Sequence, residues 1–240
     1  MTVVQEMGAD RTDCRGGLQS VFAALDLLEC FQDQKELGVS DVARQIGVAK
    51  STAHRLLTTL RARGFAERDS ESGRYRLGLR LYELGHLAVS RNELRNAALP
   101  LLQDLHHRTG ATTQLAISDN DQVLYLERVV GRDSLTRWHD IGRRMPFSST
   151  SSGKVLQAFG SQFGDGPAAL QETRKRGYAL SVDETVVGLT SVAAPVLGHD
   201  GVARAAISLV GPTPAMLANI SSPARLVQHA ARKLSLDLCL

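Results

Sequence analysis

The stretch Ser40–Gly64, SDVARQIGVAKSTAHRLLTTLRARG, constrains the fold of this chain more than any other. Ser40 is an N-cap type residue, and the apolar residues after it recur at helical spacing until Gly47 ends the run. Ser51 opens a second helix, whose apolar stripe consists of Ala53, Leu56, Leu57 and Leu60. We therefore predict two helices joined by a tight turn that contains glycine, which is the arrangement of a helix-turn-helix.

The polar face of the second helix distinguishes a DNA-reading helix from an ordinary helical hairpin. It carries hydroxyls, a histidine and arginines but no acid: Ser51, Thr52, His54, Arg55, Thr58, Thr59, Arg61 and Arg63. Phosphates and base edges are rich in hydrogen-bond acceptors, so a helix that lies on them needs donors and no carboxylates. An ordinary solvated face would mix both charge signs. The predicted contacts to double-stranded DNA on these two helices are Ser40, Lys50, Ser51, Thr52, His54, Arg55, Thr58 and Arg61.

A short hairpin is predicted directly after the second helix. Phe65–Arg68 and Arg74–Leu77 have the character of strands, and the polar residues between them that of a turn. A hairpin in this place is a wing, which can lay Arg74 and Arg76 along phosphates or in the neighbouring minor groove. Residues 40–80 carry nine bases and four acids, a balance of +5, whereas the whole chain has a net charge of only +3. Positive charge is therefore concentrated on the winged motif.

Two further helices flank the winged motif. Leu18–Phe31 predicts a support helix with an apolar face at Leu18, Val21, Phe22, Leu25 and Leu28. Gly78–Ser90 predicts a linker helix with an apolar stripe at Leu77, Leu81, Leu84 and Ala88. A helix between two domains more often shares such a stripe with a second copy, as a coiled-coil seam does. We divide the chain into a winged domain at 17–78, a linker helix at 79–91 and a second domain at 92–240.

The second domain is predicted to be an antiparallel sheet flanked by helices. A helix from about Asn92 to Arg108, interrupted by Pro100, is followed by a change from period 3.6 to period 2. Strands are expected at Thr113–Ser118, Val123–Arg128, Ser134–Trp138, Ser191–Leu197 and Val202–Val210. Further helices are expected at Ser151–Phe159, Leu170–Arg176 and Ser221–Leu236, with a glycine-rich loop at Gly160–Gly166. The predicted fold class is therefore α+β.

Composition and cysteine usage bound the class of protein. With 240 residues, of which 43% are hydrophobic and 22% charged, the chain has the composition of an ordinary folded protein. No apolar run approaches membrane-spanning length, and the first residues lack the apolar core of a secretory signal. We expect a cytoplasmic protein with a disordered tail at residues 1–16. Cys14, Cys30 and Cys239 lie far apart and in no CxxC, so neither disulfides nor a metal site nor a cofactor is expected.

Six stretches, taken in order, carry a resemblance to a known family: Gln19–Phe31, Ser40–Asp69, Gly73–Gly85, Pro146–Phe159, Arg174–Leu180 and Asp183–Pro212. With these in place the chain resembles an IclR-type bacterial transcriptional regulator over nearly its whole length. The resemblance implies a winged helix-turn-helix, a linker helix used in dimerisation and a GAF-like domain that binds a small effector. It also implies a homodimer or dimer of dimers on a pseudo-palindromic operator, and repression of a catabolic operon in response to a small organic acid.

The resemblance also implies an effector pocket in the second domain. Its predicted lining is Leu135, Arg137, Trp138, Thr150, Ser151, Ser152, Gly153, Asp183, Glu184, Pro195, Ser208 and Val210. The helix that starts at Thr150 could hold a carboxylate on its free N–H groups, although plain N-capping would explain the same residues. Surface positions are the alternative for Arg137 and Trp138, and a turn is the alternative for Asp183 and Glu184. The chain is shorter than its relatives between residues 159 and 174. It also has Ser191 and Val210 where they often have Cys and Ser, which predicts a less polar pocket.

Catalysis is not expected. Ser151–Lys154 fits the S-x-x-K pattern and Ser118–Asn120 spells S-D-N, both marks of penicillin-binding enzymes. Their order is the reverse of that family's, no K-T-G follows, and the histidines lack metal-ligand spacing. Two alternatives to a ligand-controlled regulator stay open at this point. One is an architectural DNA-binding protein whose second domain only oligomerises, and the other is an enzyme fused to a DNA tether.

Overall fold

A computed structural model of the chain describes residues 17–131, 144–161 and 167–238. The chain divides into two compact units, Met1–Ala88 and Val89–Leu240, each with its own buried core. The tail predicted at residues 1–16, the strand predicted at Ser134–Trp138 and most of the loop predicted at Gly160–Gly166 lie outside the described residues. Among the described helices, none is long and apolar enough to cross a membrane.

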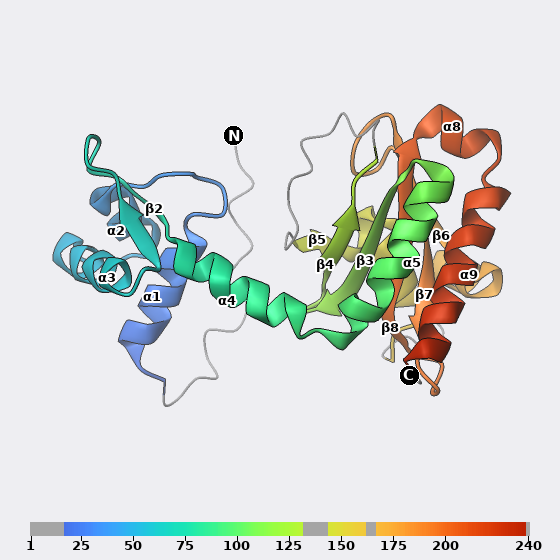
Figure 1. The fold of residues 1–240 in the computed structure, drawn as a ribbon, viewed down its shortest axis with the longest axis horizontal. Coiled ribbons are helices and arrows are strands. Elements are labelled where there is room, and N and C mark those ends of the chain that lie inside the picture. Colours follow the sequence, from blue (N-terminus) through green and yellow to red (C-terminus); the bar gives the residue numbers. More distant parts are fainter. Residues whose placement is uncertain (1–16, 132–143, 162–166, 239–240) are drawn as a thin grey trace. The chain divides into compact units, whose positions relative to one another are not determined.

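The first unit is a winged helix-turn-helix (Figure 1). Its elements are α1 (Gln19–Glu29), α2 (Val39–Gln45), α3 (Lys50–Ala62), β1 (Ala66–Arg68), β2 (Tyr75–Leu77) and α4 (Leu79–Ser90), which runs into the second unit. Gly47 lies in the turn between α2 and α3 with a φ of 69°, a backbone conformation that glycine adopts without steric cost. The strands β1 and β2 pair in antiparallel fashion, with Ala66 opposite Leu77. The predicted helix-turn-helix and hairpin are confirmed.

The core of the first unit joins all of these elements except α4. Its buried residues are Leu27, Phe31, Leu37, Val42, Ala43, Ala53, Leu57, Ala66 and Tyr75. Tyr75 of the wing is only 2% exposed. Its backbone also exchanges two hydrogen bonds with Leu37, at N···O distances of 2.9 and 2.8 Å. The segment before α2 therefore adds a bridge to the wing, and the hairpin is fixed to the helices by both side chain and backbone.

Two details of the first unit differ from the sequence prediction. Ser40 does not cap α2, because the N-cap is Gly38 and Ser40 lies exposed in the first turn. The Asp41 carboxylate accepts the backbone N–H of Gly38 at 3.1 Å, so an acid in the first turn takes the capping role. The support helix α1 buries Leu27, whereas most of the apolar face predicted for it is exposed: Leu18 (71%), Val21 (51%), Phe22 (38%) and Leu25 (54%).

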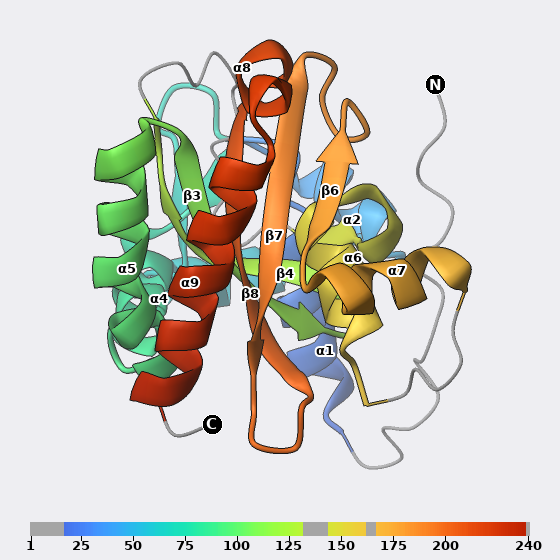
Figure 2. The ribbon, with the colours of Figure 1, turned by 90° about the vertical axis from the view of Figure 1, so that its right-hand side faces the viewer.

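The second unit is a six-stranded antiparallel sheet with helices on both faces (Figure 2). Its strands are β3 (Thr112–Asp119), β4 (Gln122–Val129), β5 (Arg144–Pro146), β6 (Ala179–Val182), β7 (Leu189–Leu197) and β8 (Ala203–Pro212). They pair in the order β5-β4-β3-β8-β7-β6. The α+β fold class is confirmed.

The helices of the second unit divide between the faces of the sheet. They are α5 (Glu93–Thr109), α6 (Ser151–Ala158), α7 (Ala168–Arg176), α8 (Thr213–Ala218) and α9 (Ser221–Asp237), with a 3-10 turn, η1, at Phe147–Ser149. Helices α5 and α9 pack on one face around Leu115 and Ile207, and α6 packs on the other around Ala116 and Ala206. The predicted interruption at Pro100 is wrong: α5 runs through it unbroken. Pro100 is exposed, so water can reach the backbone that its missing N–H leaves without a donor.

Candidate nucleic-acid interface and effector cavity

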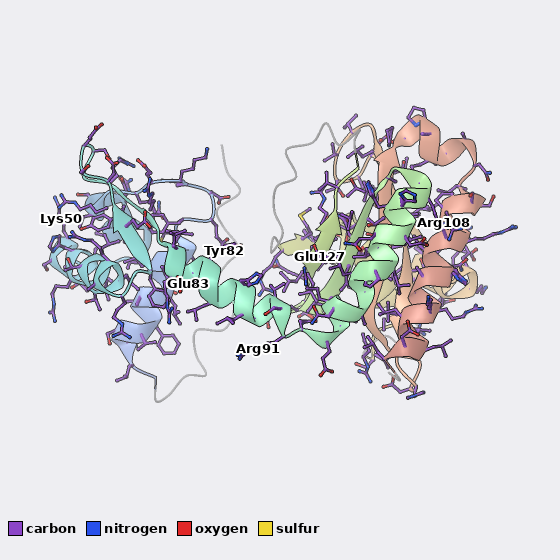
Figure 3. All side chains as sticks on the ribbon, viewed as in Figure 1. Lys50, Tyr82, Glu83, Arg91, Arg108 and Glu127 are labelled. Carbon is purple, nitrogen blue, oxygen red and sulfur yellow. The ribbon has the colours of Figure 1, made fainter. Side chains whose placement is uncertain are left out.

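Helix α3 turns an acid-free polar face to solvent. Ala53 and Leu57 are buried in the core of the first unit. The predicted contacts on the other side are exposed: Lys50, Ser51, Thr52, His54, Arg55, Thr58 and Arg61. Lys50 stands at the start of α3 (Figure 3). Segregation of this kind leaves the donors of the helix available to an acceptor-rich surface such as DNA.

The donors on α3 differ in what they already bind. Thr58 and Thr59 donate their hydroxyl protons to the carbonyls of His54 and Arg55, at 2.8 and 2.9 Å, so in this arrangement they offer only acceptors. Four cations have no ion pair or hydrogen-bonded partner within the described residues: Lys50, Arg55, Arg61 and Arg63. These four are the groups best able to contact phosphates or base edges.

The wing arginines, in contrast, are engaged inside the first unit. Arg74 donates to the carbonyl of Glu36 at 3.1 Å and to the carboxylate of Asp41 at 3.3 Å. Arg76 donates through two nitrogens to one carboxylate oxygen of Glu67, at 3.0 and 2.9 Å. The contact of Arg74 and Arg76 with phosphate was predicted from the sequence alone, and these internal partners count against it. Their internal partners reduce the free charge that the wing offers to DNA.

A small cavity lies on the α6 face of the second unit, and we call it the α6 cavity. Its lining consists of Gln114, Tyr125, Thr150, Ser181, Thr185, Val186, Leu189, Ser191 and Val210. The volume of about 20 Å³ has room for about one water molecule. No carboxylate is among its described lining residues.

At the start of α6, Thr150 lines this cavity, and Ser151 contacts the lining residue Ser191. Thr150 caps the helix by accepting the backbone N–H of Gly153 at 2.9 Å. The Ser151 hydroxyl donates to the Ser191 hydroxyl on β7 at 2.8 Å. Gly153 has no room for a side chain, because a Cβ there would lie 2.3 Å from the carbonyl oxygen of Phe147. This close approach positions the helix start against η1.

Polar residues of the sheet complete the α6 cavity. Burial raises the pKa of the Tyr125 phenol above its ordinary value, although the hydroxyls of Ser152 and Thr150 beside it partly offset this rise. Tyr125 therefore stays protonated at neutral pH and can donate a hydrogen bond. Ser208, which was predicted to line the pocket, is not among the lining residues, but its hydroxyl donates to the side-chain oxygen of the lining residue Gln114 at 3.3 Å.

Of the other residues that were predicted to line the pocket, some have different partners and some fall outside the described part of the chain. Asp183 accepts the N–H of Gly188 and the hydroxyl of Thr213, both at 2.8 Å, and so organises the turn before β7. Glu184 forms an ion pair with Lys154 at 2.6 Å. Pro195 lies four residues along β7 from Ser191 and does not line the cavity. Three predicted residues fall outside the described part of the chain: Leu135, Arg137 and Trp138.

Several lining residues were not predicted: Gln114, Tyr125, Ser181, Thr185, Val186 and Leu189. In the sequence, the signal that could have indicated these residues was Gln114, a polar side chain within a predicted strand. Only the strand register shows that Gln114 lies beside Ser208, and that Ser191 lies beside Val210.

Comparison with known proteins matches both units. The IclR helix-turn-helix domain matches residues 20–70, and the bacterial transcriptional regulator IclR C-terminal domain matches residues 86–163 and 167–236. The chain belongs to the IclR family of bacterial transcriptional regulators, as its motifs indicated. This is a family of DNA-binding regulators and not of enzymes.

Individual relatives agree with this assignment. The HTH-type transcriptional regulator XynR of Escherichia coli is 38% identical over 215 residues, covering 80% of this chain and 85% of the relative. A glycerol operon regulatory protein of Streptomyces griseus is 36% identical, covering 75% and 78%. The structure of an IclR homologue complexed with 4-hydroxybenzoate, from Microbacterium hydrocarbonoxydans, is 27% identical with a TM-score of 0.76, covering 91% and 98%.

Arg55 is an unpaired donor on the exposed face of α3. We therefore predict that Arg55→Ala weakens binding to a specific operator by roughly 1–3 kcal/mol. The variant should also lose sequence preference at one base pair of the operator. Fluorescence anisotropy with operator and single-base variants measures both effects. Thr59→Ala is the control, since its hydroxyl already bonds to the helix backbone. Parent-like affinity and preference in Arg55→Ala would show that another residue reads the base.

Proposed function

We propose that this regulator is a dimeric repressor of a catabolic operon, acting in the cytoplasm and controlled by a small organic acid in the α6 cavity. The observation that carries the proposal is the convergence of donors on that cavity. Gln114, Tyr125 and Ser191 come from three different strands and line the cavity with no described carboxylate between them, and the Ser191 hydroxyl, which accepts from Ser151, still has its own proton to donate. Such a site is suited to a carboxylate or a hydroxyl of a ligand.

The relatives support this choice of ligand and role. A structural neighbour binds 4-hydroxybenzoate, which is a small hydroxy acid. Relatives include glycerol operon regulatory proteins, and the transcriptional repressor IclR of Escherichia coli is 27% identical over 222 residues. A repressor of a catabolic operon that is controlled by an acid of the pathway is consistent with both facts.

The small volume of the α6 cavity suggests how a ligand would act. The turn that follows β6 is tied to η1 by the Thr185 hydroxyl, which donates to the Ser149 carbonyl at 2.7 Å. Across the same gap Lys154 bonds to Glu184 and to the carbonyl of Leu180. A ligand larger than a water molecule must separate these segments. It therefore favours a more open state and can shift DNA affinity only through that preference.

The dimer is proposed from exposed apolar side chains on α1 and α4. Helix α4 buries none of its residues and exposes several large ones: Leu79, Tyr82, Leu84, Leu87 and Val89. Tyr82 and the neighbouring Glu83 are marked on α4 in Figure 3. The exposed side chains of α1 add further apolar surface that a second copy could cover. A two-fold dimer would match the two half-sites of a palindromic operator.

The effector proposal predicts a response that depends on the α6 cavity. Operator affinity is measured by anisotropy with and without a pool of small hydroxy acids that includes 4-hydroxybenzoate, and with the corresponding amides. We expect one acid to change affinity by roughly 5- to 150-fold, as is common for such couplings. The combined variant Ser191→Ala and Tyr125→Phe, which removes two hydroxyls of the lining, should bind operator like the parent and lose the response.

The same titration separates the alternatives. By reciprocity, operator DNA must change the affinity for the acid by the same factor, which calorimetry measures. A response that survives in the double variant would place the effector elsewhere. No response to any acid would favour the architectural role, in which the second unit only oligomerises.

The dimer proposal predicts that Leu84→Glu combined with Leu87→Glu produces a monomer with strongly reduced operator affinity, because two charges would then lie in the apolar seam. Sedimentation velocity measures the mass, and Glu83→Gln on the same helix is the control. A parent that sediments as a monomer would contradict the proposal.

A further inference from the structure

A second and larger cavity lies beside α8, and we call it the α8 cavity. Its walls come from α8, the first turns of α9, the end of α5 and the ends of β3, β4, β7 and β8. Its volume is about 400 Å³, within the range of roughly 300–1,000 Å³ that is usual for small-molecule sites. The α6 cavity is far smaller, with about 20 Å³.

The two cavities adjoin but are different sites. They share only Leu189 and Val210 among their described lining residues. The α8 cavity also reaches Leu209 and Leu226, which pack in the core on the α5 and α9 face of the sheet. No residue of α6 is among its described lining residues. A ligand in the α8 cavity therefore has no need of the polar groups at the start of α6.

Apolar side chains and glycine backbone form most of the wall of the α8 cavity. The larger apolar side chains are Leu209, Met216 and Leu226. Met216 is only 7% exposed, and its flexible thioether can adjust to the shape of a bound molecule. Such a wall favours a ligand with an apolar body, because binding removes apolar surface of both partners from water.

The two threonines of the lining differ in what they already bind. The Thr109 hydroxyl donates to the Leu105 carbonyl at 2.7 Å and accepts the N–H of Ala111 at 3.2 Å, so its proton is in use. The Thr112 oxygen accepts the N–H of Gly131 at 3.0 Å, which leaves the hydroxyl proton to be donated. Thr112 is only 5% exposed. It is therefore a buried donor that an acceptor of a ligand can use.

The other polar groups of the lining point to a neutral ligand. Asn219 accepts the Ser221 hydroxyl at 2.9 Å through its amide oxygen, so its amide nitrogen can still donate. Arg128 already has an interaction partner, and we assign it no part in binding. No other charged side chain is among the described lining residues. A carboxylate would have to leave water for a largely apolar space, which costs free energy, whereas a carbonyl oxygen loses little water and suits the donors.

We propose that the α8 cavity is a second ligand site, which binds a neutral, largely apolar molecule with a carbonyl oxygen and about a dozen non-hydrogen atoms. The carbonyl oxygen accepts from the Thr112 hydroxyl, and the apolar body lies against Met216 and Leu226. The site requires no opening of the structure, in contrast to the α6 cavity. It goes beyond the effector proposed above and does not depend on it, because the ligand and its polar contacts are different.

Methionine methyl groups provide a test that locates the ligand. The full chain has four methionines, of which Met216 lines the α8 cavity and Met145 packs against the core on the α6 face. The protein is labelled with ¹³C at the methionine methyl groups and titrated with the ketone 4-phenyl-2-butanone, without DNA. We expect a saturable shift of the Met216 signal and an unchanged Met145 signal. The anion 4-phenylbutyrate should bind at least about tenfold more weakly, because its charge must be desolvated.

Matched variants make the result specific. Ala215→Trp fills the cavity from an exposed position on α8 and should abolish the Met216 shift. Ala218→Trp, also exposed on α8 but outside the lining, should bind like the parent. Thr112→Val should weaken binding of the ketone roughly three- to tenfold, the usual effect of one lost hydrogen bond. Thr112→Ser keeps the hydroxyl and should bind like the parent.

Any of four results would overturn the proposal. They are an absent Met216 shift in the parent, unchanged binding in Ala215→Trp, parent-like binding in a folded Thr112→Val protein, and an acid that binds as tightly as the ketone. Because no operator is present, these results do not depend on whether the α6 cavity controls DNA binding.

Discussion

The attachment of the wing through Tyr75 is the constraint on which the first unit depends. The ring is buried in the core of the first unit, and the backbone N–H and C=O of Tyr75 both hydrogen bond to Leu37. On its other edge β2 pairs with β1, with Tyr75 opposite Arg68. Burying an aromatic side chain of this size contributes about 1.5–3 kcal/mol. With the wing held in this way, α3 has one apolar side in the core and one polar side in solvent.

Some cations of the first unit are paired with carboxylates, and others have no such partner among the described residues. Exposed ion pairs such as those of Arg74 and Arg76 contribute about 0–1 kcal/mol each, so they stabilise the wing only slightly. Their effect on function is larger, because a paired arginine brings less net charge to a phosphate. The cations on α3 have no such partners among the described residues and keep their full charge. We therefore expect α3 to contribute more than the wing to the attraction to DNA.

Elements with a strong repeating pattern were predictable from sequence, and short or cross-strand features were not. Apolar spacing predicted α2 and α3, and alternation predicted β3, β4, β7 and β8. The strands β5 and β6 span only three and four residues, too few for a pattern to appear. The start of α6 was predictable as a helix N-terminus, but its partner Ser191 depends on the pairing of β7.

Local geometry also redirected several candidate side chains. The pairing of β3 with β4 has a register shift after Leu115, where Leu115 lies opposite Glu127, and Glu127 forms an ion pair with Arg95 of α5. Asp183 and Glu184 form bonds to Thr213 and Lys154, residues about thirty positions away in the chain. No local pattern could show these partners. The sequence thus indicated the type of site, and the fold determined which groups line it.

The claim that the unpaired cations of α3, and not those of the wing, contact phosphate is tested most directly by salt dependence. The measurement is operator affinity against salt concentration for the parent, Arg61→Ala and Arg76→Ala. Each lost phosphate contact lowers the slope of log affinity against log salt by about one. We predict that reduction for Arg61→Ala and a parent-like slope for Arg76→Ala. The opposite pattern would contradict the account.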